Sequence, residues 1–140
     1  MTDFLKGVLE LDLYPAVIQY YQHQNYFIEL EIPIHRNRID LVAYDSDQII
    51  AVELKLKNWR RALRQAAYYQ LGTDFSYIAL PFYEAIGVCN RPWELAKEGV
   101  GLLAVLLDKS EVRELIKPRR SKKKLEYIER GIYLSIRKRH

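Results

Sequence analysis

Two carboxylates and one lysine are spaced so that they could form a metal-dependent hydrolytic site. Asp40 lies in segment 38–44 and Glu53 in segment 48–55; both alternate and are rich in strand-forming residues. Asp45-Ser46-Asp47 between them has turn chemistry, and a two- or four-residue loop there sets Asp40 directly opposite Glu53. Facing like charges destabilise an antiparallel pair, so these acids predict a divalent cation with oxygen ligands, such as Mg²⁺.

Lys55 is two residues beyond Glu53 and is therefore expected on the same face of the strand. An ammonium group beside the carboxylates could orient a water molecule or stabilise charge on a phosphate. The alternative is that these are two strands whose charged ends lie on a solvated face, since acids and lysines are common there.

The remaining pattern predicts an α/β fold, with a mixed sheet flanked by helices. The first 24 residues are expected to be helical, with Pro15 bending that helix or starting a second one. Asn58 is a predicted N-cap of a helix that runs to Leu71 and ends at Gly72. The other expected elements are strands 26–34, 75–80, 101–107 and 112–116, a basic turn at 35–38, a short helix at 92–97 and a final helix at 121–137.

Composition suits one domain with a real core, because the chain has 140 residues and is 49% hydrophobic. No apolar run is long enough to span a membrane and no secretory signal is visible, so we expect a cytoplasmic protein without a membrane partner. Cys89 is the single cysteine, which excludes an intrachain disulfide, and the three histidines form no zinc pattern.

Charge is distributed unevenly along the chain. Residues 117–140 carry ten Lys or Arg and two Glu, a net charge of +8, which leaves −4 for residues 1–116 in a chain of net charge +4. We therefore divide the chain into a core domain over 1–116 and a basic C-terminal helix or tail over 117–140 that packs on the core or extends from it. Such asymmetry favours a polyanionic partner; a solubilising, partly disordered tail is the alternative.

The helix after Lys55 carries a second basic feature. Lys57, Arg61 and Arg64 recur at three- and four-residue spacing, and Gln65 and Tyr69 share a face at i and i+4. We predict that these basic groups hold a phosphate backbone; a solvated helix face and ordinary packing of Tyr69 are the alternatives. The full set of predicted nucleic-acid contacts is Arg36, Arg38, Lys57, Arg61, Arg64 and Tyr69.

The order of these motifs resembles the PD-(D/E)XK nuclease superfamily, and Gln65-x-x-x-Tyr69 resembles its RecB-like branch. Glu10 to Pro15, with the later Val-Glu-Leu-Lys, also resembles small uncharacterised bacterial members. The resemblance covers a little over half the chain and implies a restriction-endonuclease-like core: a helix, a three-strand meander, a helix and a strand. No proline precedes Asp40, but that proline is often missing from the family, and the last 40 residues match no family we can name.

The resemblance also implies roles for individual residues. Asp40 and Glu53 would bind Mg²⁺ or Mn²⁺, and the carbonyl of Leu54 would complete the metal site. Lys55 would position or activate the attacking water, and Gln65 would support Lys55 or a phosphate.

A further acidic residue near the metal is common in this superfamily. Glu10 on the first helix resembles it, although Asp12 lies two residues away and either acid could instead be a helix-start charge.

We therefore expect a metal-dependent nuclease acting on DNA, guided by substrate structure or ends because no sequence-reading module is recognisable. Junction cleavage, one version of this activity, would predict a homodimer. The alternatives are a non-catalytic nucleic-acid-binding module that keeps the nuclease fold, or an RNase, since nothing in the chain selects deoxyribose over ribose.

Overall fold

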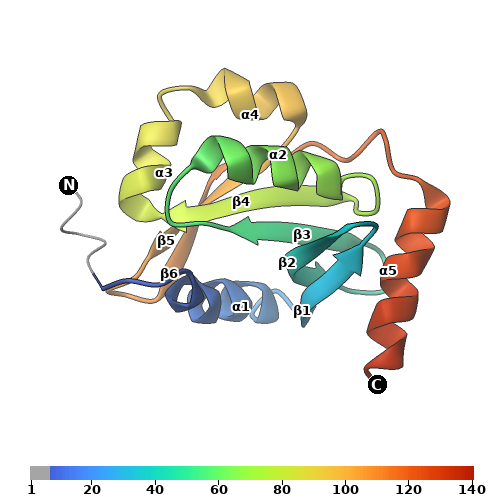
Figure 1. Ribbon diagram of the computed structural model, residues 1–140. Coiled ribbons are helices and arrows are strands. Elements are labelled where there is room, and N and C mark those ends of the chain that lie inside the picture. Colours follow the sequence, from blue (N-terminus) through green and yellow to red (C-terminus); the bar gives the residue numbers. More distant parts are fainter. Residues whose placement is uncertain (1–6) are drawn as a thin grey trace.

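Alternating apolar residues build one six-stranded mixed sheet with the strand order β1-β2-β3-β4-β5-β6. The computed structural model describes residues 7–140 (Figure 1). Strand β2 is antiparallel to both of its neighbours, β1 and β3. Strands β3, β4 and β5 run parallel, and β6 is antiparallel to β5. The strands span Phe27–Ile34 (β1), Asn37–Tyr44 (β2), Ile49–Leu54 (β3), Phe75–Pro81 (β4), Gly101–Leu106 (β5) and Glu111–Ile116 (β6).

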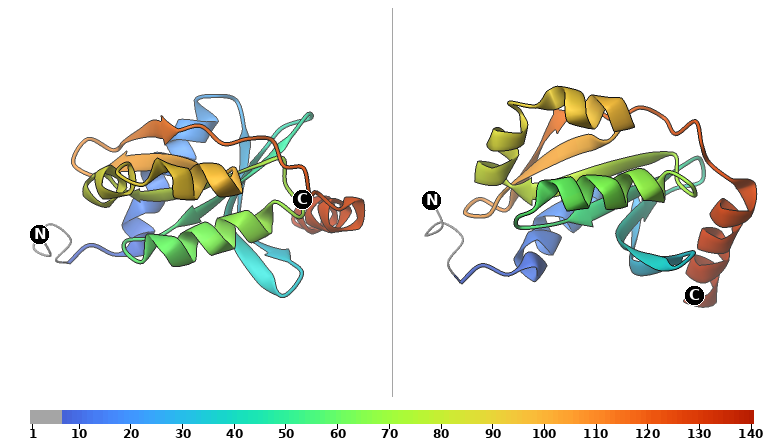
Figure 2. Two further views of the ribbon diagram at one scale, coloured as in Figure 1. Left: turned by 90° about the horizontal axis from the view of Figure 1, so that it is seen from above. Right: turned by 45° about the horizontal axis from the view of Figure 1, so that its top comes forward.

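Helices cover both faces of this sheet, which confirms the predicted class of a mixed sheet flanked by helices (Figures 1 and 2). Helix α1 packs on one face, while α2, α3 and α4 pack on the other and α5 lies at the β1–β2 end. The helices are α1 (Tyr14–Gln22), α2 (Trp59–Tyr69), α3 (Phe82–Val88), α4 (Pro92–Glu98) and α5 (Glu126–Lys138), with a 3₁₀ helix, η2, at Glu10–Leu13.

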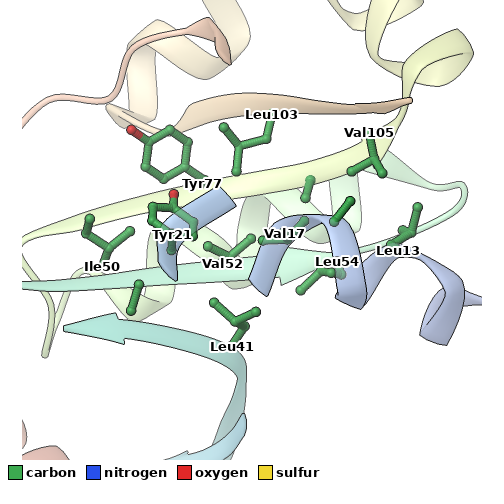
Figure 3. Packing of buried hydrophobic residues seen from close by; sticks show 13 residues of the cluster. Leu13, Val17, Tyr21, Leu41, Ile50, Val52, Leu54, Tyr77, Leu103 and Val105 are labelled. Atoms are coloured by element: carbon green, nitrogen blue, oxygen red, sulfur yellow. The ribbon is translucent and has the colours of Figure 1, made fainter. Parts of the chain in front are cut away.

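The core beneath α1 surrounds the strands that carry the predicted site. Figure 3 shows the apolar side chains of α1 facing those of β2 and β3. Burial of these side chains, at about 25 cal/mol per Å² of apolar surface, holds the ends of β2 and β3 in a rigid frame. The labelled contacts come from Leu13, Val17 and Tyr21 on the helix side and from Leu41, Ile50, Val52, Leu54, Tyr77, Leu103 and Val105 on the sheet side.

The β2–β3 hairpin has the predicted register. Leu41 pairs with Val52 and Tyr44 with Ile49, so the next position sets Asp40 opposite Glu53. The side chain of Asp45 closes the turn by accepting hydrogen bonds from the backbone N–H groups of residues 47 and 48, at 2.8 and 3.0 Å. The turn chemistry therefore determines the register, as expected.

Several predicted helix boundaries are wrong. The helix expected over the first 24 residues is the short η2 followed by α1, which begins at Tyr14 with Pro15 in its first turn, so the predicted alternative of a second helix starting here holds; residues 1–6 of that prediction lie outside the described residues. Asn58 precedes α2 but is left-handed (φ 57°), and its side chain makes no capping hydrogen bond. Helix α2 ends at Tyr69, and the final helix begins at Glu126 instead of residue 121.

Helix α3 is absent from the sequence prediction. Pro81 ends β4, as expected. The same residue is the N-cap of α3, which follows it directly. A short helix has little periodicity to detect, and three of its large apolar side chains, Phe82, Tyr83 and Ile86, are exposed, while only Ala85 and Val88 are buried.

The C-terminal segment packs on the core and is not a disordered tail. Ile128, Ile132 and Ile136 of α5 are buried against Ile34 and Tyr69, among others. The linker of residues 117–125 that precedes α5 is pinned by backbone hydrogen bonds to residues 71, 74 and 99. None of the helices within residues 7–140 is long and apolar enough to cross a membrane.

Candidate active site

Asp40 and Glu53 meet at the end of the β2–β3 hairpin as a hydrogen-bonded carboxyl pair. The backbone N–H of Leu54 donates to Asp40 Oδ2 at 3.0 Å, which fixes the aspartate against β3. Glu53 is only 8% exposed, so water solvates its carboxyl group poorly. The predicted proximity of the two acids is therefore present, and both belong to rigid strands.

Burial raises the pKa of both acids above their ordinary values. The pKa of Glu53 rises to about 8, first because the side chain is buried and then because Asp40 is negatively charged nearby. The pKa of Asp40 is also raised by burial, although the Leu54 N–H opposes the shift. At neutral pH Glu53 therefore keeps a proton and donates it in a hydrogen bond to Asp40. A divalent cation placed between them would replace that proton.

Tyr69 supports the pair from inside the protein. Its hydroxyl group lies 2.5 Å from Glu53 Oε1 and 2.9 Å from the carbonyl oxygen of Arg38. The side chain is 1% exposed, so it is not the surface contact for nucleic acid that the sequence suggested. Gln65 and Tyr69 lie one turn apart on α2, as expected, but the Tyr69 side chain points toward the sheet.

Lys55 follows the last residue of β3 and reaches toward the N-terminal part of the chain. Its backbone N–H donates to the carbonyl of Ala79 at 3.1 Å, and its Nζ lies 3.8 Å from Glu10 Oε2. Asp12 instead accepts a hydrogen bond from the N–H of Leu9 at 2.8 Å and starts η2. Of the two acids considered from the sequence, the structure therefore brings Glu10 to the site and leaves Asp12 as a helix-start residue.

Gln65 lies one turn before Tyr69 on α2 and is half-buried. Within residues 7–140 its side chain makes no hydrogen bond, and therefore none to Lys55. A free amide at this position is available to a bound substrate.

The residues predicted to contact the nucleic-acid backbone, apart from Tyr69, are exposed. Arg36 and Arg38 lie in and beside the β1–β2 turn, and Lys57, Arg61 and Arg64 lie before and along α2. None of these five forms an ion pair with another described residue, whereas Arg60 pairs with Glu94 at 3.0 Å. The five cations are therefore free for an external anion.

Glu31 is a site residue that the sequence prediction missed. The β1–β2 pairs Leu30–Leu41 and Ile32–Ile39 flank it, so it lies opposite Asp40, yet it leaves the ladder with a left-handed backbone (φ 55°). Its charge contributes to the raised pKa of Asp40. Extending the register argument from the β2–β3 hairpin to the β1–β2 hairpin would have found it.

Tyr14, the first residue of α1, was also missed. The pKa of its phenol is raised, first by burial and then by the charges of Asp40, Glu31 and Glu53. This electrostatic coupling places the start of α1 near the carboxyl pair. No sequence signal marked it, because an aromatic residue at a helix start is common.

Arg139 holds the irregular part of β1. Its guanidinium group donates to the carbonyl oxygens of Leu30 at 2.5 Å and Glu31 at 2.9 Å, and it pairs with Glu29 at 3.3 Å. His140 contacts the same Glu29. The basic end of the chain is thus partly occupied in binding the strand that faces Asp40.

The residues present fit a hard divalent cation better than zinc. No group of three or more His, Cys, Asp or Glu side chains in the described part of the chain is arranged to hold a metal. Mg²⁺ and Mn²⁺ sites need fewer protein ligands, because one or two carboxylates act together with water and substrate oxygens. Two buried acids that share a proton form such a partial ligand set.

Comparison with known proteins gives a fold and no function. No protein-family model matches the sequence, and no curated protein matches it. A solved structure of a protein of unknown function from Silicibacter pomeroyi, SPO1766, superposes with a TM-score of 0.64. The two chains are 15% identical, and the match covers 91% of this chain and 85% of that one. At this identity the likeness concerns the fold alone.

Proposed function

We propose that this protein is a metal-dependent nuclease that hydrolyses DNA phosphodiester bonds and has a restriction-endonuclease-like core. The observation that carries the proposal is the proton-sharing pair of half-buried Asp40 and buried Glu53 next to Lys55. The raised pKa of Glu53 would be costly in a purely structural pair, and such perturbed acids cluster at functional sites. The element order from α1 through β1, β2, β3 and α2 to β4 supports the same family.

In this mechanism Asp40, Glu53 and the carbonyl of Leu54 would hold Mg²⁺ or Mn²⁺. When bound, the cation would polarise the scissile phosphate and lower the pKa of a coordinated water. Lys55 stabilises the negative charge that develops on the phosphate, and Glu10, at 3.8 Å, orients its ammonium group. Tyr69 holds Glu53 in place through their hydrogen bond.

The exposed cations hold the DNA backbone without reading its sequence. Arg36 lies in the β1–β2 turn and Arg38 on β2, the strand that carries Asp40, while Lys57, Arg61 and Arg64 follow Lys55 along the chain. Phosphate contacts of this kind position a duplex or a single strand and carry no direct sequence information. Gln65, whose amide is free, binds a phosphate oxygen beside them.

The test is cleavage of circular plasmid and circular single-stranded DNA with Mg²⁺ or Mn²⁺. Asp40→Asn and Lys55→Ala should each lower the rate by at least about 10²-fold, since each removes a group that acts on the reacting phosphate. Asp47→Asn, in the exposed β2–β3 turn, and Lys109→Ala, in the exposed β5–β6 turn, are the matched controls and should retain activity.

Other substrates separate the alternatives. Cleavage of RNA but not DNA of the same sequence would identify an RNase. The catalytic proposal fails if neither nucleic acid is cut and if Mn²⁺ raises the melting temperature of wild type no more than that of Asp40→Asn. A binding module then remains.

A further inference from the structure

We propose that a pocket beside Gln70, at the C-terminal end of α2, is a second phosphate site, which binds the nucleic-acid backbone through residues other than those of the carboxyl pair. The pocket has a volume of about 220 Å³ and lies where α2, α4 and the linker of residues 117–125 meet (Figure 2). Five basic side chains line it, against one acid, Glu98. The basic residues are Lys97, Arg119, Arg120, Lys122 and Lys123.

The linker that carries most of these cations is held in place. The Arg119 N–H donates to the Gly99 carbonyl at 3.0 Å, and its Nη1 donates to the Ala96 carbonyl at the end of α4 at 2.6 Å. Ser121 binds α2 through its Oγ, which donates to the Gln70 carbonyl at 2.7 Å. A cationic pocket on such a frame needs little ordering when it binds an anion.

Much of the positive charge in the pocket is uncompensated. Arg120 pairs with Asp74 at 3.3 Å, so its charge is partly offset. In contrast, Lys97, Lys122 and Lys123 have no acidic partner within 4.0 Å among residues 7–140. Three free ammonium groups around one hollow create a positive potential that favours a phosphate.

A second hollow connects the exposed face of α2 with this pocket. It has a volume of about 380 Å³ and lies between α2 and α4; it shares Lys97 and Glu98 with the pocket and is lined by Arg64. The 11 residues of α2 span about 16 Å. At about 3.4 Å per nucleotide step, this length corresponds to roughly five nucleotides. One backbone could therefore reach from Lys57 past Arg64 to the pocket.

The identity of the ligand rests on the proposed function, whereas the pocket itself does not. The experiment measures binding of a fluorescent 12-nucleotide single strand by anisotropy in EDTA, over a range of salt concentrations. Lys122→Gln/Lys123→Gln removes two pocket charges, and Arg137→Gln/Lys138→Gln removes two charges from the exposed end of α5. The pocket variant should bind the strand about tenfold more weakly. The slope of the logarithm of the binding constant against the logarithm of the salt concentration should become less steep by about 1.4, at about 0.7 per lost phosphate contact. Equal losses in both variants, or no loss in the pocket variant, would overturn the inference.

Two further arms identify the source of the phosphate. A three-nucleotide strand is too short to reach from Lys57 along α2 to the pocket, so the pocket charges should change its affinity much less than that of the 12-nucleotide strand. If inorganic tripolyphosphate binds the pocket as tightly as the 12-nucleotide strand, the pocket takes a free phosphate compound and the backbone assignment fails. Cleavage with Mg²⁺ is assayed separately: pocket-dependent binding without cleavage would reject the nuclease proposal and leave this inference standing.

Discussion

Arg139, next to the last residue of the chain, donates a 2.9 Å hydrogen bond to the carbonyl of Glu31, the residue that faces Asp40. The contact joins α5 to the irregular part of β1. A non-glycine residue in the left-handed region costs about 1–2 kcal/mol, and the carbonyls that leave the ladder need donors. The guanidinium group supplies two of them.

Arg139→Ala should therefore destabilise the protein by about 1–3 kcal/mol, because it removes the donors of two carbonyls and a salt bridge. Urea unfolding monitored by circular dichroism measures this change. Arg137→Ala, two residues earlier on the exposed side of α5, is the control and should change stability by less than about 0.5 kcal/mol. Equal stability of the two variants would show that the contacts between Arg139 and β1 contribute nothing to the free energy of unfolding.

Tyr69→Phe should raise the pKa of Glu53 further, because the hydroxyl hydrogen bond lowers it in the native protein. The variant also leaves the Arg38 carbonyl without this donor, which should cost about 1–3 kcal/mol of stability. A carbon-13 NMR titration of the Glu53 carboxyl and urea unfolding measure the two effects. Tyr68→Phe, at the neighbouring half-buried position, should leave the titration unchanged.

The metal-free protein should lose stability as the pH rises from about 4.5 to about 8. The pKa of Glu53 is raised from 4.5 to about 8 on folding, so the folded state binds the proton more tightly than the unfolded chain. The resulting stability is fully present below the unfolded pKa and is lost as pH passes through the folded pKa, by a few kcal/mol in total. Urea unfolding in EDTA at pH 5, 7 and 9 tests this.

Glu53→Gln should flatten this pH profile, because the amide does not titrate. Saturating Mn²⁺ should reverse the slope in wild type, since the cation binds the deprotonated pair. A wild-type profile as flat as that of Glu53→Gln would contradict the raised pKa.

Gly72→Ala should loosen the docking of α5. An added Cβ would lie 2.7 Å from Ile132 Cδ1 and 2.8 Å from Ile128 Cγ2, so both side chains must shift. Overpacking of this kind costs about 1–3 kcal/mol. Gly131→Ala is the matched control: nothing lies within 4 Å of its Cβ, and alanine inside α5 should stabilise by about 0.5–1 kcal/mol. Thermal unfolding of both variants measures the difference.

The local pattern was sufficient for the parts of the fold and candidate site that depend on neighbours in sequence. The β2–β3 register follows from the Asp45 turn and from strand alternation, so the juxtaposition of Asp40 with Glu53 was predictable, as was the order of the strands. Helix boundaries were less predictable. Asn58, for example, is the N-cap residue of α2, as predicted, but it adopts a left-handed backbone and its side chain makes no capping hydrogen bond.

Contacts between distant segments required the tertiary structure. Tyr69 was expected on the surface, but the packing of α2 on the sheet decides which face of that helix is buried. The left-handed Glu31 is held by Arg139, 108 residues away. The cations of the linker meet Lys97 because backbone hydrogen bonds hold the linker against residues 71, 74 and 99. Periodicity specifies which residues share a face of one element, whereas the free energy of burial between elements decides what that face meets.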